Sequence, residues 1–204
     1  MRRSPLGRLV GSVLSWLLFS FCLTLLFQSA LVVMGLGGFC ASGGPYEIRT
    51  ECPATVAWAT PVSILGGCLA VGIALLLAGG FGLPLVDWAW PALFCGLAVA
   101  FGIAGAAGSI AFVAIAVVFA IMGLVPAVIG LRAAWQRTVL GTANLAGARL
   151  AEHPEARASL TSRAAVNPDG SVTARPIDWA AGLIPAAVAI AAGIWLGALV
   201  FAAG

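Results

Sequence analysis

Long apolar runs, separated by short polar or glycine-rich stretches, dominate this chain. A helix of about 20 mainly apolar residues crosses the hydrocarbon core of a bilayer. The segments that meet this criterion are residues 9–37, 58–80, 88–106, 109–130 and 179–203. The pattern therefore predicts an all-α polytopic transmembrane helix bundle with five spans.

The first run follows a basic tip, "MRRSPLGR", as the apolar region of a signal peptide also does. Its length is about 29 residues, roughly 43 Å as a helix, against the ~7 to 15 residues of a signal-peptide core. We therefore expect a retained span.

The third and fourth spans need an argument because the chain is almost uninterrupted from residue 91 to residue 130. This stretch is about twice as long as the hydrocarbon core can hold as one helix. The sequence "GIAGAAGSI" lies at its centre and favours a tight turn. We predict a helical hairpin that turns near Gly105 to Ser109, and the alternative is one kinked or partly re-entrant helix.

Arginine placement predicts the orientation, because basic residues near span ends stay in the cytoplasm. With five spans, one orientation keeps nine of the ten arginines inside and exposes only Arg49. The N-terminus is then cytoplasmic, the C-terminus is outside, and residues 38–57 form an extracytoplasmic loop of a multi-pass plasma-membrane protein. The nine are Arg2, Arg3, Arg8, Arg132, Arg137, Arg149, Arg157, Arg163 and Arg175.

Composition agrees with a membrane protein and limits the classes of partner that we expect. Hydrophobic residues make up 62% of the chain and charged residues 8%, with a net charge of +3. A nucleic-acid surface needs cations clustered on one face, whereas these arginines are spread over two segments. We expect the lipid bilayer as a partner and no nucleic acid.

The loop "GGFCASGGPYEIRTECPA" holds two cysteines on the outer side, where disulfides form. A bond between Cys40 and Cys52 would close a ring of about 13 residues, which is worth near 3 kcal/mol in the chain-entropy model. Gly43, Gly44 and Pro45 favour a sharp turn within it. We predict a compact, disulfide-closed cap.

Charged residues follow that turn with the period of an extended strand. Glu47, Arg49 and Glu51 would project from one side, next to Tyr46. These four residues are candidate contacts for a ligand or partner. The alternative is an ordinary polar loop that the disulfide keeps ordered.

The stretch "CASGGPYEIRTECP", from Cys40 to Pro53, resembles a motif of small multi-pass membrane proteins of unassigned activity, often from high-GC actinobacteria. The resemblance covers the first span, the loop and the start of the second span, about a quarter of the chain. It implies an integral membrane location and no particular activity.

Polar residues follow one face of the first span. Ser12, Ser20, Thr24 and Gln28 are spaced by eight, four and four residues, which places them along one side of a helix. They could hydrogen-bond to neighbouring helices, at about 1 kcal/mol or less each. They could instead line a polar path for a solute.

Small residues at four-residue spacing predict close helix packing or a dimer face. Gly193 and Gly197 have this spacing in the fifth span, and Ala98, Gly102 and Ala106 have it in the third.

Two spans begin with a carboxylate followed by an indole. The carboxylate is suited to the N-cap of a helix, and the indole is suited to the membrane interface. These pairs are Asp87 with Trp88 and Asp178 with Trp179.

No combination of residues indicates a catalytic site, a cofactor or a metal. Cys22, Cys68 and Cys95 lie in spans without other ligands, so we expect them to act as small apolar residues. His153, the one histidine, stands in a charged turn with Glu152 and Glu155. Spans without embedded charges also make a proton-coupled pump a poor candidate.

The chain divides into a four-span region, residues 1–130, a cytoplasmic segment, residues 131–177, and the fifth helix, residues 178–204. The cytoplasmic segment begins as a basic amphipathic helix that could lie along the inner leaflet or continue the fourth span. The sequence "VNPDGSV" further on fits a short hairpin or a linker.

The leading functional hypothesis is a non-enzymatic structural or accessory subunit that contacts a membrane-protein partner or a second copy of itself. The alternative is a channel or facilitator for a small solute, with the polar face of the first span along the path.

Overall fold

The computed structural model describes residues 5–38, 40–41, 50–79, 81–140, 165–166, 172–173 and 176–204. Its long helices are α1 (Pro5–Gly35), α2 (Ala54–Ile73), α3 (Leu85–Ala106), α4 (Ile110–Leu140) and α7 (Pro176–Ala203). A π-helical turn, η1 (Ala74–Ala78), extends α2. Within the described chain, five helical segments are long and apolar enough to cross a membrane. The predicted all-α bundle with five spans is confirmed.

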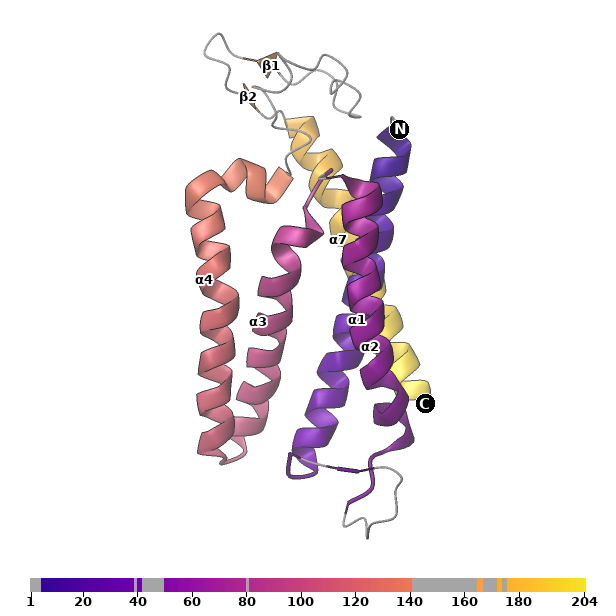
Figure 1. Ribbon diagram of the computed structural model, residues 1–204, viewed down its shortest axis with the longest axis vertical. Helices are drawn as coiled ribbons and strands as arrows, with labels where there is room; N and C mark the ends of the chain where they lie inside the picture. Colours follow the sequence, from indigo (N-terminus) through magenta and orange to yellow (C-terminus); the bar gives the residue numbers. More distant parts are fainter. Residues whose placement is uncertain are drawn as a thin grey trace.

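Helix α1 is the centre of the bundle (Figure 1). It packs against α7, α2 and α3, while α4 packs mainly against α3. Helices α2 and α3 follow each other in the chain but make few contacts. The α3–α4 hairpin therefore stands beside the group formed by α1, α2 and α7, and it is joined to that group chiefly through α1.

Helices α2 and α3 each begin directly after a proline. Pro53 occupies the N-cap position of α2, and Pro84 occupies that of α3. A proline costs nothing there, because the first N–H groups of a helix have no partner within the helix. The second and third spans consequently begin a few residues earlier than the hydropathy pattern indicates.

Asp87 lies in the first turn of α3, where a carboxylate favours the helix dipole, but Pro84 occupies the N-cap position. Asp87 therefore does not occupy the N-cap position expected of it. Pro84 occupies that position and makes no side-chain hydrogen bond to the helix. The side chain of Asp178 lies outside the described residues.

The hairpin between the third and fourth spans is confirmed. Helix α3 ends at Ala106 and α4 begins at Ile110. Gly108 has a φ of 111° and its N–H donates to the Gly105 carbonyl at 2.9 Å, so the turn uses a backbone conformation suited to glycine. Ring contacts of Phe101 with Phe112 and Phe119, at centroid distances of 5.8 and 5.4 Å, hold the two helices together.

Helix α4 bends near residue 130. The Thr138 hydroxyl donates to the Gly130 carbonyl at 3.0 Å, whereas eight residues of straight helix would separate these positions by about 12 Å. The indole N–H of Trp88 donates to the Thr138 carbonyl at 2.8 Å, which ties the bent end to α3. Figure 1 shows this last part of α4 lying across the end of the bundle.

Two short strands follow, β1 (Ala165–Val166) and β2 (Val172–Thr173). They pair antiparallel, with Ala165 opposite Thr173 and Val166 opposite Val172. This pairing is the one that the hairpin interpretation of "VNPDGSV" predicts, and residues 167–171 between the strands lie outside the described residues. The predicted continuation of the amphipathic helix beyond residue 140, and His153 with its neighbours, lie outside the described residues.

Candidate functional site

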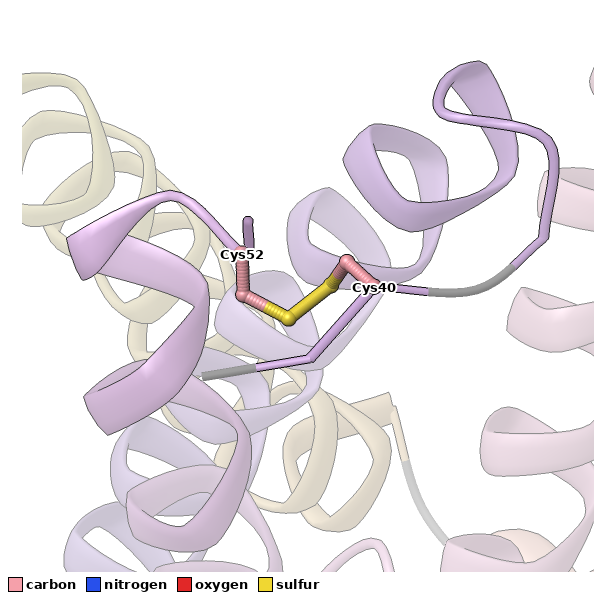
Figure 2. The surroundings of a disulfide bond; sticks show 2 residues. All are labelled: Cys40 and Cys52. Carbon is pink, nitrogen blue, oxygen red and sulfur yellow. A yellow bond between two sulfur atoms is a disulfide. The ribbon is translucent and has the colours of Figure 1, made fainter. Parts of the chain in front are cut away.

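A disulfide joins Cys40 to Cys52, as the sequence predicts (Figure 2). The two Cα atoms are 4.9 Å apart. Beside the bond, the Ala41 N–H donates to the Thr50 carbonyl at 3.0 Å and the Cys52 N–H donates to the Ala41 carbonyl at 3.2 Å. The bond and this short backbone pairing together hold the segment after α1 against the segment before α2.

The candidate contact residues of the cap are described only in part. Glu51 is exposed and its backbone takes part in the bridge to Ala41. Tyr46, Glu47 and Arg49 lie outside the described residues, so their contact with a ligand or partner stays a prediction.

The polar face of α1 meets the glycines of α7. A Cβ added at Gly193 would lie 2.5 Å from the Leu17 carbonyl oxygen and would collide with the Ser20 hydroxyl. A Cβ at Gly197 would lie 2.9 Å from the Cβ of Thr24. Because Gly193 and Gly197 thus oppose Ser20 and Thr24 in the same order, α1 and α7 run parallel at close range.

The Ser20 and Thr24 hydroxyls on this face are bonded within α1 itself. Ser20 donates to the Trp16 carbonyl at 2.7 Å, and Thr24 donates to the Ser20 carbonyl at 2.8 Å. These bonds satisfy the hydroxyl donors without a partner across the interface. Ser20 and Thr24 therefore let α7 approach through their small size, and the interface is held by packing.

Ser12 and Gln28, at the two ends of the polar face, differ from this pair. Ser12 is buried, and its carbonyl accepts the Ser15 hydroxyl at 2.9 Å. Gln28 is half-buried. The sequence reasoning missed Ser15 and Ser29, which are 1% and 2% exposed, although a hydroxyl group within a membrane span is itself a signal of inward orientation.

Small residues in α3 behave differently from those in α7. A Cβ added at Gly102 would have no atom within 4 Å. Among the described residues, the side of α3 at Gly102 therefore meets no close neighbour. The four-residue spacing of small residues therefore corresponds to a close helix contact in α7, whereas Gly102 in α3 makes no such contact.

Two of the cysteines within spans fill close helix contacts. The Cys22 sulfur lies 2.5 Å from a Cβ built on Gly66, and the Cys95 sulfur lies 2.7 Å from one built on Gly123. Cys68 is exposed on α2. Within the described part of the chain, no three His, Cys, Asp or Glu residues are placed to hold a metal ion.

Comparison of the chain with protein-family models, curated proteins and solved structures gave no match. The geometry itself defines the class. The protein is an integral membrane helix bundle with five spans, built around α1 and closed at one end by a disulfide-linked connection.

Proposed function

We propose that the protein is a non-enzymatic accessory or structural subunit of the plasma membrane, oriented with its N-terminus in the cytoplasm, and that α4 contacts a membrane-protein partner. The observation that carries this proposal is the position of α4. Of the five spans, that of α4 has the smallest buried share.

The core of the bundle is complete without α4. Its buried cluster is drawn from α1, α2, η1, α3 and α7, and among the described residues α4 contributes no member to it. Along α4, large apolar side chains stay uncovered, with Ile110 87%, Ile121 57% and Ile129 62% exposed. In a membrane this surface meets lipid or another helix. A helix that its own bundle needs so little is suited to contact a partner.

The polar groups of the spans favour a static bundle rather than a path for a solute. Ser20 and Thr24 lie against Gly193 and Gly197, so a path lined by these hydroxyls would require α7 to separate from α1. The channel is therefore the second candidate, with Gln28 as the residue that tests it.

A photoreactive amino acid placed in α4 tests the partner. We would insert it at Val117 in α4, which is 54% exposed, and at Val188 in α7, which is 63% exposed, as the matched control. After irradiation of intact cells, Val117 should give one discrete protein adduct and Val188 only lipid adducts. Mass spectrometry of the adduct distinguishes a different protein from a second copy.

Lipid adducts from both positions would contradict the accessory role. Solute flux in liposomes that is lost on Gln28→Leu would then establish the channel instead.

A further inference from the structure

A cavity of about 420 Å³ lies between α1, α2 and α3. Its walls are mostly large apolar side chains, and every lining residue belongs to a membrane-spanning segment. Pockets of about 300 to 1,000 Å³ are typical of sites for small organic ligands. The main apolar lining residues are Phe19, Leu23 and Leu26 of α1, Ile64 and Val71 of α2, and Leu93 of α3.

The cavity exists because α2 and α3 diverge. Both pack on α1 but they hardly touch each other. On α2, the wall includes Gly67, where an added Cβ would meet no atom within 4 Å. The space is therefore left by the missing side chain of Gly67 and by the separation of the two helices.

Polar groups in the wall are already satisfied. The Ser63 hydroxyl donates to the Thr60 carbonyl at 2.7 Å, and the indole N–H of Trp90 donates to the Met122 carbonyl at 3.2 Å. A ligand here finds no free strong donor among these groups and meets the apolar ring of Trp90. The site therefore suits a ligand made of methylene groups.

The cavity opens sideways, between α2 and α3. On its rim Ile64 is 54% and Trp90 52% exposed, and Cys68 is also exposed. At this position within the spans the surrounding medium is the hydrocarbon of the bilayer. One turn of a partner helix, about 5.4 Å long and 10 Å wide, would already occupy the whole volume. A single acyl chain is narrow enough to enter lengthwise.

We propose that this cavity binds one acyl chain of a membrane lipid or free fatty acid. Lipid tails are as apolar as the walls, so selection depends on shape and close packing. The chain would fill the space between α2 and α3 and give these two helices the contact that they lack. This inference is independent of the partner proposed for α4.

Filling the cavity with a side chain tests the proposal. Gly67→Phe places a ring in the cavity, and Gly72→Phe is the control, because Gly72 also lies on α2 with nothing within 4 Å of its Cβ but does not line the cavity. Each protein is reconstituted with two probes: palmitic acid with a diazirine in mid-chain, and phosphatidylglycerol that carries the same chain. Irradiation and peptide mass spectrometry locate the labelled residues.

We expect labelling of the lining residues to fall about tenfold in Gly67→Phe, as overpacking a filled site predicts, and to persist in Gly72→Phe. Labelling by one probe alone identifies the source of the chain, and labelling by both shows that the head group does not matter. Equal labelling of the lining residues in both variants would overturn the proposal.

The native cysteines give a second measurement that needs no variant. Cys68 lines the cavity and Cys95 does not. Palmitate added to the detergent-solubilised protein should slow the reaction of Cys68 with an apolar maleimide and leave the rate at Cys95 unchanged. An unchanged rate at Cys68 would count against an acyl chain in the cavity.

Discussion

Replacement of Gly193 by alanine probes the close contact between α1 and α7. The new Cβ would lie 2.5 Å from the Leu17 carbonyl oxygen, and ordinary contact begins at 3.4 Å, so α7 must recede by about 0.9 Å. Overpacking by one methyl group costs about 1–3 kcal/mol. We expect the upper end of that range, because the obstacle includes backbone, which cannot rotate away.

Gly102→Ala is the matched control, since its Cβ meets no atom within 4 Å. The gain in helix propensity, up to about 1 kcal/mol, is common to both variants. The difference in their free energies of unfolding should therefore approach 3 kcal/mol. Ser20→Ala in the Gly193→Ala background should recover only part of the loss, because the Leu17 carbonyl stays in place.

Unfolding in mixed micelles with increasing SDS, followed by tryptophan fluorescence, measures these differences. If Gly193→Ala and Gly102→Ala unfold at the same SDS fraction, the parallel contact of α1 with α7 is not formed as described.

Two further predictions concern the disulfide-linked connection from α1 to α2 and the α3–α4 hairpin. Cys40→Ser should lower stability by about 3 kcal/mol in the chain-entropy model, and in the native protein a membrane-impermeant thiol reagent should label Cys40 and Cys52 of intact cells only after reduction. Labelling without reduction would contradict the bond. Trp90→Phe removes the donor to the Met122 carbonyl and should cost about 1 kcal/mol. That cost should shrink in Pro126→Ala, whose new N–H can serve the same carbonyl, and an equal cost in both backgrounds would refute this role of Trp90.

Hydropathy was sufficient to predict the five spans, because the length of an apolar run is a property of the chain alone. The turn between α3 and α4 was also predictable, since two spans of apolar sequence must reverse somewhere and Gly105 and Gly108 mark the place. The π-helical turn at Ala74–Ala78 was not predictable. It lies where Gly11 of α1 closely approaches Leu77, a contact between distant parts of the chain.

The candidate site was likewise predictable only in part. The polar face of α1 and the glycines of α7 are each visible in the sequence, but nothing in the sequence pairs Ser20 with Gly193. That pairing follows from which helices become neighbours, and it favours helix contact as the role of Ser20 and Thr24. The cavity was missed for a related reason: Gly67 looks like Gly66, yet only Gly66 is covered by Cys22.

Two independent rules favour one orientation for this bundle. Arginine near a span end stays in the cytoplasm, and disulfides form outside it. Arg132 is exposed where α4 bends across one end of the bundle, and the Cys40–Cys52 bond closes the connection from α1 to α2 at the other (Figure 1). In the orientation that these rules favour, a helix that lies across this end of the bundle can place basic side chains among anionic head groups. The bend thus gives Arg132 a physical reason to be there, which a straight continuation of the fourth span would not.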